Sequence, residues 1–245
     1  MHDAVEAVRA DRLALLDIGR GLALAQWQAP SGCPGWSVQD VIAHLATGFW
    51  AVVDLSQLPD VTGQPFEHAQ EILVESRRGM SPQATLDDYE QVSATGLERL
   101  AGLATLDVPV PMGDAGTYPA SALPAAYAFD HYTHIRADLF APRGPLDGEP
   151  PPSDELRTGL ALDWIEAALP QQNAHAAAQA TIEIQLTGAG GRSISFGSGP
   201  VKASVTSDAP AFVRWVTQRA TWSDLGVDAA GDEQALAVAR SLKVY

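Results

Sequence analysis

The fold of this chain is decided by the stretch Gly35-Trp36-Ser37-Val38-Gln39-Asp40-Val41-Ile42-Ala43-His44-Leu45. Ser37 followed three residues later by Asp40 is typical of a helix start, because the hydroxyl caps an unpaired backbone N–H and the carboxylate favours the positive end of the helix dipole. Apolar residues continue at helical spacing after this pair. The stretch therefore predicts a helix over residues 37–56, and it places the ionisable side chain of His44 on or beside the buried face.

Length and net charge limit the number of domains and the classes of partner that the chain can have. Its 245 residues suffice for two domains of ordinary size. Lys and Arg total 15 against 30 Asp and Glu, so the formal net charge of −15 repels nucleic acid and anionic lipid. No basic segment leads into an apolar run near the N-terminus, and no stretch approaches the roughly 20 apolar residues of a membrane span. We therefore expect a cytoplasmic protein with neither nucleic-acid nor membrane partners.

Cysteine usage narrows the choice of metal ligands. Cys33 is the only cysteine, so neither an internal disulfide nor an all-cysteine metal site is available. Any metal is therefore expected to use histidine and carboxylate ligands. Cys33 itself lies in a proline-rich turn, where we interpret it as a small structural residue and assign it no chemistry.

Helical periodicity, interrupted by proline and glycine, fills the first part of the chain. We interpret residues 107–118 as a loop, because two prolines and two glycines there are too many breakers for a helix. A further run rich in proline and glycine, at 142–152, is typical of a linker, so we expect domains at residues 1–145 and 153–245. The helices expected in the first domain cover residues 3–26, 37–56, 66–78, 81–100 and 120–140.

The second half of the chain changes character. After a helix at 156–169, the residues of 181–187 alternate between apolar and polar, with β-branched side chains, as in a half-buried strand. Short strands are expected at 193–196 and 201–205, and further helices follow from Ser207 and at 232–242. The pattern predicts a small α+β domain in which a three-stranded, mainly antiparallel sheet is covered by helices.

The last helix of the first domain carries a stripe of ionisable side chains. Residues spaced by three or four share one face of this helix: Tyr127, Asp130, His134 and Asp138. A stripe facing a bundle interior must be paired, hydrated or bound to metal, because unpaired buried charge is costly. Asp130 and His134, one turn apart, are spaced to reach a single ion, with His44 as a third ligand. Three protein ligands leave a coordination position open for water or a thiol.

Two interpretations of this pattern stand side by side. On spacing alone the structural one is favoured, because a D-x-x-x-H pair is common by chance and one sequence does not show which helices meet. In that interpretation His44 is a core histidine bonded to a carbonyl, and a solvated charged face is formed by Asp130, His131, His134 and Arg136. If a metal binds, zinc is expected, although nickel, iron and manganese accept the same ligands.

A family resemblance favours the metal site. The motif Cys33-Pro34-Gly35-Trp36-Ser37-Val38-Gln39-Asp40-Val41-Ile42-Ala43-His44-Leu45 resembles the signature of the mycothiol-dependent maleylpyruvate isomerase family, part of the DinB-like metal-binding superfamily. Asp130-x-x-x-His134 stands where the family has a Glu-x-x-x-His pair, and the C-terminal region resembles the family's own C-terminal domain. The resemblance implies a DinB-like four-helix bundle, a divalent metal held by His44, Asp130 and His134, and a small α+β domain that helps to enclose the site.

Some positions depart from the family pattern or match it only loosely. Asp130 is one methylene shorter than the usual Glu, which leaves contact through water, or His131 as the second ligand, as alternatives. The family more often has an acidic residue three positions beyond the last histidine, whereas Asp138 lies four beyond His134. Arg219 resembles a basic residue that the family directs at anionic substrate. Tyr127 is interpreted either as a hydrogen-bond donor to a bound cofactor or as a half-buried core tyrosine.

The resemblance implies an enzyme that uses a divalent metal and a small thiol such as mycothiol. The metal makes the thiol a thiolate at neutral pH, and the thiolate adds to an electrophilic small molecule, giving isomerisation or thiol transfer. The alternative is a non-catalytic protein that binds metal or a small ligand. In either case we expect a monomer or homodimer whose partners are small molecules.

Overall fold

The computed structural model describes residues 2–245, with side chains from Ala4 onward. It divides into two compact units, the first ending at Pro152 and the second covering Ser153–Tyr245. Across residues 2–245, none of the helices has both the length and the apolar character that crossing a lipid bilayer requires.

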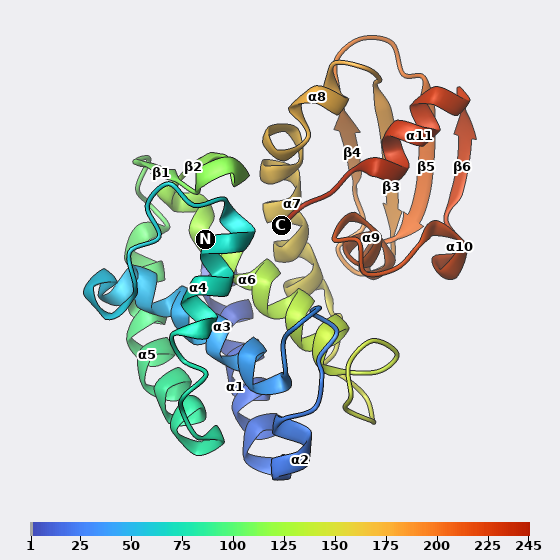
Figure 1. Ribbon diagram of the computed structural model, residues 1–245. Coiled ribbons are helices and arrows are strands. Elements are labelled where there is room, and N and C mark those ends of the chain that lie inside the picture. The colour runs from blue at the N-terminus through green and yellow to red at the C-terminus, as the bar shows by residue number, and fades with distance from the viewer. Residues whose placement is uncertain (1) are drawn as a thin grey trace. The chain divides into compact units, whose positions relative to one another are not determined.

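The first unit is built around four helices, whose arrangement Figure 1 shows. They are α1 (His2–Gly21), α3 (Val38–Val53), α5 (Pro82–Leu103) and α6 (Leu123–Thr133). Helix α3 packs along α5, and α1 packs against α5 and α6. The apolar stripes of these helices meet in a core whose side chains are at most 1% exposed, among them Val8, Leu15, Val41, Leu45 and Leu100. The helical bundle expected from the sequence is confirmed, because each helix buries the stripe that its periodicity marks.

Helix α3 begins where its sequence predicts. The Ser37 hydroxyl accepts a hydrogen bond from the backbone N–H of Asp40, and the Asp40 carboxylate accepts one from the backbone N–H of Ser37 at 2.9 Å. This reciprocal cap satisfies two backbone donors that lack partners within the helix. The helix ends at Val53, earlier than expected, and Asp54 caps the short turn η1 (Leu55–Gln57). The cap thus fixes the start of α3 two turns before His44.

Shorter elements connect the four helices, and some differ from expectation. The single helix expected at 3–26 is interrupted after Gly21, and the chain becomes helical again in α2 (Leu24–Trp27). The expected loop at 107–118 holds a small antiparallel pair, β1 (Pro109–Pro111) and β2 (Thr117–Pro119). Proline is compatible with such an edge pair, because it can occupy positions that donate no ladder hydrogen bond. The other short elements of this unit are α4 (Phe66–Glu75), η2 (Gly113–Ala115) and η3 (Ala120–Ala122).

The helix expected at 120–140 is not uniform. Helix α6 runs directly into a π-helix, η4 (His134–Leu139), which begins at the histidine of the predicted stripe. A π-helix has wider turns than an α-helix, and such turns are often found at functional sites. The side chains beyond His134 are therefore displaced from the positions that regular helical spacing predicts.

The second unit is an α+β structure with a four-stranded sheet (Figure 1). Strand β3 pairs in parallel with β5, while the β3–β4 and β5–β6 pairs are antiparallel. Buried residues alternate with more exposed ones along β3 and β5, and helices α7 and α9 pack on strands of the sheet. The elements are α7 (Glu155–Gln172), α8 (Ala174–Ala177), β3 (Ile182–Thr187), β4 (Ser193–Phe196), β5 (Ala203–Asp208), α9 (Ala209–Val216), α10 (Trp222–Leu225), β6 (Asp228–Gly231) and α11 (Glu233–Ser241).

The expectation of three strands is wrong, because the sheet has a fourth. Strand β6 has the sequence Asp-Ala-Ala-Gly, and all of its residues are exposed. It carries neither the apolar alternation nor the β-branched residues by which a strand is found in a sequence. It joins the sheet through backbone pairing with β5, which involves no side-chain pattern.

Close packing of α3 against α5 predicts a specific sensitivity at Gly96. A Cβ atom at this buried position would lie 2.2 Å from Cδ1 of Phe49, whose side chain is fully buried. We expect Gly96→Ala to lower the free energy of unfolding by about 1–2 kcal/mol, because overpacking outweighs the better helix propensity of alanine. Urea unfolding followed by circular dichroism measures the change.

The matched control is Gly102→Ala on the same helix, where a Cβ atom meets nothing within 4 Å. This change is expected to be neutral or to stabilise the protein by up to about 1 kcal/mol. Equal stability of the two variants would contradict the packing argument.

Candidate functional site

Three side chains from separate parts of the first unit converge at one point. Nε2 of His44, on α3, lies 3.3 Å from Oδ1 of Asp130, on α6. Nε2 of His134, at the start of η4, lies 3.3 Å from the same oxygen. The two imidazole rings meet edge to face with their centroids 4.9 Å apart. The structure therefore brings together the three residues that the sequence proposes as metal ligands.

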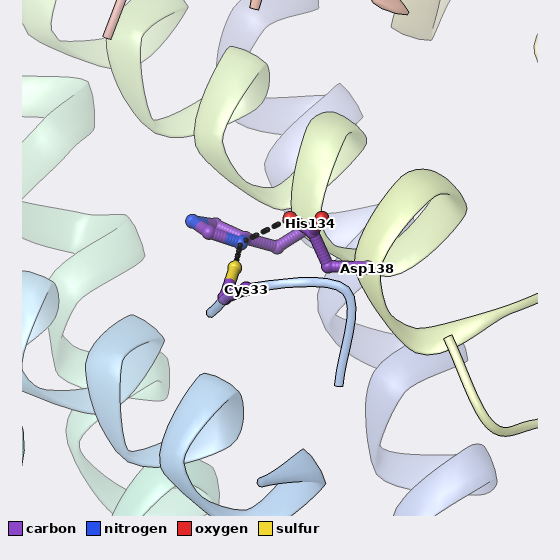
Figure 2. A group of neighbouring side chains, drawn as sticks. All are labelled: Cys33, His134 and Asp138. Carbon is purple, nitrogen blue, oxygen red and sulfur yellow. Dashed lines mark hydrogen bonds and ion pairs between the residues drawn. The ribbon is translucent and has the colours of Figure 1, made fainter. Parts of the chain in front are cut away.

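The other nitrogen of His134 has its own partners, which Figure 2 shows. Nδ1 lies 2.9 Å from Oδ2 of Asp138, which is fully buried, and 3.5 Å from Sγ of Cys33, in the loop before α3. A carboxylate only accepts hydrogen bonds, so Nδ1 carries the proton that it donates to Asp138. In the neutral ring this leaves a lone pair on Nε2, the nitrogen that faces Asp130. Asp138 thus selects the tautomer of His134 that can bind a metal.

The electrostatics of the cluster favour a positive charge. Burial by itself would lower the pKa of His134, but Cys33 and the hydrogen bonds to Asp130 and Asp138 outweigh it and raise this pKa well above its usual value. Burial would likewise raise the pKa of Asp130, but His44 and His134 hold it well below the usual range. Asp130 is therefore ionised at neutral pH, and a metal ion bound between it and the two imidazoles would replace the proton on Nε2 of His134.

The donor set fits a divalent metal ion. The three donor atoms lie within 4.8 Å of one another. A tetrahedral zinc ion with bonds of about 2.0–2.1 Å separates its ligands by roughly 3.3–3.4 Å, and both distances from Asp130 to the histidines are 3.3 Å. Imidazole nitrogen and carboxylate oxygen are ligands that zinc, nickel, iron and manganese all accept. About one third of the Asp130 side chain is exposed, so solvent reaches this side of the cluster.

His131, the alternative second ligand, points elsewhere. Its Nδ1 donates a hydrogen bond to the backbone carbonyl of Tyr127 at 2.8 Å, and its Nε2 lies 2.9 Å from the Tyr89 hydroxyl, on α5. The residue is buried, and this burial lowers its pKa, so the neutral ring accepts from Tyr89. Both ring nitrogens are engaged, one within α6 and the other with α5, which leaves Asp130 beside the two histidines.

Tyr127 and Arg219, the other two predicted site residues, have local hydrogen bonds of their own. The hydroxyl of Tyr127 donates to the backbone carbonyl of Gly48, on α3, and burial raises its pKa above the usual value. Arg219 belongs to the second unit, where its guanidinium donates to the carbonyl of Thr217 at 3.3 Å. Neither contact involves the three converging side chains, so the roles of these two residues remain proposals.

Trp36 is a contact of the site to which the sequence analysis assigns no role. Its indole lies 5.1 Å from the ring of His44 and 6.4 Å from that of His134, measured between centroids. Its N–H donates to Glu71, on α4, at 2.6 Å. The position of Trp36 directly before the helix cap is a usable sequence signal. No pattern in the sequence singles out Glu71.

Comparison with known proteins identifies the family. A sequence profile of the mycothiol maleylpyruvate isomerase N-terminal domain matches residues 8–140, more than half of the chain. The chain belongs to the mycothiol maleylpyruvate isomerase family. The profile covers the bundle helices that carry His44, Asp130 and His134. A search among curated proteins gives no match.

Two crystal structures share the fold of this family member over nearly its whole length. One is the mycothiol-dependent maleylpyruvate isomerase, with a TM-score of 0.62 and 17% sequence identity. The other is a histidine-to-alanine mutant of a mycothiol-dependent maleylpyruvate isomerase, with a TM-score of 0.64 and 16% identity. Each alignment covers 94% of this chain and 93% of the other. At such low identity the likeness establishes the fold, in both the helical and the sheet-containing parts.

The hydrogen bond from His134 to Asp138 predicts a loss of metal affinity when it is weakened. Asp138→Asn keeps the shape of the side chain but removes the charge that fixes the proton on Nδ1. We expect zinc affinity, measured by calorimetric titration, to fall about 10- to 100-fold, as is typical when the partner of a ligand histidine is lost.

The control is Asp88→Asn, which neutralises a half-buried aspartate elsewhere in the bundle. Asp88 accepts a hydrogen bond from the Trp50 indole at 3.0 Å and pairs with Arg77 at 3.6 Å. Its substitution is expected to leave zinc affinity unchanged. If both variants bind zinc as the wild type does, Asp138 does not tune the site.

Proposed function

We propose that this family member is a metal-dependent enzyme that activates a small thiol for addition to an electrophilic small molecule. The observation that carries the proposal is the convergence of His44 Nε2, His134 Nε2 and Asp130 Oδ1 at separations suited to one tetrahedral ion. Family membership supports mycothiol as the thiol. A conjugated acid of the maleylpyruvate type is the electrophile that the family description suggests.

Each residue of the proposed site has its own role. A divalent metal, with zinc as our first choice, supplies the Lewis acidity that lowers the pKa of a thiol. His44 and His134 bind through Nε2, and the carboxylate of Asp130 balances part of the positive charge. Asp138 keeps the proton on Nδ1 of His134. The exposed edge of Asp130 supports an open site rather than a sealed structural one, because a thiol must enter from solvent.

The proposed reaction begins with addition of the thiolate sulfur to the conjugated double bond of the substrate. The bond becomes single and rotates, and elimination then returns the thiol together with the isomerised product. If the adduct is released instead, the same first step gives a thiol transferase. Both reactions require the thiol in its reduced form, and the reducing cytoplasm would keep it so.

The metal site is tested with His44→Ala and His134→Ala. We expect near-stoichiometric metal in the wild type and no more than about one tenth of it in each variant, with thiol-dependent turnover lost in parallel, because each change removes one of three ligands. Elemental analysis of the purified proteins and a coupled assay with thiol and electrophile measure both effects.

The matched control is His68→Ala, an exposed histidine on α4, which is expected to keep both metal and turnover. Unchanged metal content and turnover in His44→Ala would refute the proposed site. Metal that is bound and lost as expected, but without any thiol-dependent turnover, would favour a non-catalytic metal-binding protein.

We further propose that Arg219 binds an anionic group of the substrate and that Tyr127 contributes a hydrogen bond to the bound thiol, its hydroxyl giving up the carbonyl of Gly48 for this partner. Arg219→Gln is expected to raise KM for a carboxylate-bearing electrophile about tenfold or more, because a charge-assisted hydrogen bond is lost, and to leave metal content unchanged. Arg214→Gln, on the preceding helix α9, is the control. Equal KM values for the two variants would remove Arg219 from the mechanism.

A further inference from the structure

The two candidate histidine ligands are held in different ways. Nδ1 of His134 donates to the buried carboxylate of Asp138. Nδ1 of His44 is also buried, yet it has no hydrogen-bond partner among the residues that the structure describes. Ligand histidines usually have their ring orientation fixed by a hydrogen bond at the nitrogen that does not bind metal. Another contact must therefore orient the ring of His44.

The indole of Trp36 provides that contact. Its centroid lies 5.1 Å from the imidazole of His44, with the planes inclined by 45°, and 6.4 Å from that of His134, with the planes inclined by 25°. Both separations are within the range of favourable aromatic packing. The indole thus lies against both rings and limits how far the ring of His44 can rotate about its Cβ–Cγ bond.

The indole is itself held by a hydrogen bond that continues into a series of ion pairs. Its N–H donates to Oε2 of Glu71 at 2.6 Å, and Oε1 of Glu71 accepts from Nη2 of Arg78 at 2.9 Å. Nε of Arg78 lies 3.3 Å from Oδ1 of Asp40, whose other oxygen caps α3. The chain of contacts therefore runs from Trp36 through α4 and back to the first turn of the helix that carries His44.

We propose that Trp36 and Glu71 are positioning residues for the metal site. Glu71 fixes the indole, and the indole keeps the His44 ring turned so that Nε2 faces Asp130. A ring held in this way is already in its binding orientation, so less conformational freedom is lost when a metal binds. The inference rests on the proposed function, because it concerns the metal affinity of that same site.

Glu75 provides a control for the loss of negative charge when Glu71 is replaced. Glu75 is on the same helix and pairs with the same guanidinium, through Nη1, whereas the indole N–H is bonded to Glu71. Side chains of Glu71, Glu75 and Arg78 are 44%, 65% and 33% exposed, so these ion pairs contribute little to folding stability. Replacing either glutamate removes one negative charge near Arg78, but only one replacement frees the indole.

The experiment is calorimetric titration of the metal-stripped full chain with Co²⁺, together with its ligand-field absorption spectrum. Glu71→Leu is expected to weaken Co²⁺ binding about tenfold or more and to change the spectrum. Glu71→Gln keeps an oxygen acceptor for the indole and is expected to bind within about threefold of the wild type, as is Glu75→Leu. Thermal unfolding midpoints of all variants are expected to match that of the wild type.

A second variant removes the other partner of the hydrogen bond between Trp36 and Glu71. Trp36→Phe keeps an aromatic ring but removes the N–H that Glu71 accepts. It is expected to weaken Co²⁺ binding, and combining it with Glu71→Leu should add little further loss, because both changes remove one interaction. This variant answers the question even if Glu71→Leu fails to fold.

The outcomes separate this inference from the proposed function. If the wild type binds Co²⁺ and Glu71→Leu binds it as tightly as Glu75→Leu does, the positioning role is overturned and the proposed function stands. Equal weakening in all three glutamate variants would show a charge effect alone and would also overturn it. Failure of the wild type to bind Co²⁺ would refute the metal site itself, and the inference with it.

Discussion

The carboxylate of Asp130 lies between two imidazoles inside a helical bundle, and the rest of the first unit is arranged around this contact. An ionised carboxylate in such a place is unfavourable unless positive charge and hydrogen-bond donors compensate it. His44 and His134 provide both, each 3.3 Å from the same oxygen. The contact requires α3 and α6 to meet at one level. The cap at Ser37 sets that level for α3, and the change from α- to π-helix occurs at His134 itself.

Much of the fold follows from local sequence patterns. The Ser37 and Asp40 pair predicts the start of α3, and apolar periodicity predicts the bundle, because both depend on residues within a few positions of each other. Strand β6 is not predicted because it joins the sheet by pairing with β5 while its own exposed residues show no strand pattern. The π-helix at His134–Leu139 is not predicted either, because apolar spacing does not distinguish it from an α-helix. In both cases the conformation depends on tertiary contacts, which local sequence patterns do not reveal.

In the candidate site, too, some residues are marked by nearby sequence patterns, whereas others depend on contacts between distant segments. Spacing along one helix places Asp130 and His134 on one face, and the family resemblance favours these two residues and His44 as metal ligands. From the sequence, His131 is an alternative to Asp130 as the second ligand. In the structure α6 packs against α5, and His131 is hydrogen-bonded to Tyr89 instead. The contact of Trp36 with Glu71 likewise depends on where α4 docks. Helical spacing marks Asp138, four residues beyond His134, but Trp36 and Glu71 lie on other segments of the chain, so no periodicity marks them.

The candidate ligands also constrain the order of events during folding. His44 and Asp130 are 86 positions apart in the chain. A site of such long-range origin exists only once α3 and α6 have docked, unlike a zinc finger, in which nearby ligands bind the ion and organise the chain around it. At the proposed site, a metal ion would therefore bind only to a bundle that has already assembled. By mass action it would then stabilise the folded protein against unfolding, and it would not stabilise a truncated chain that lacks one of these helices.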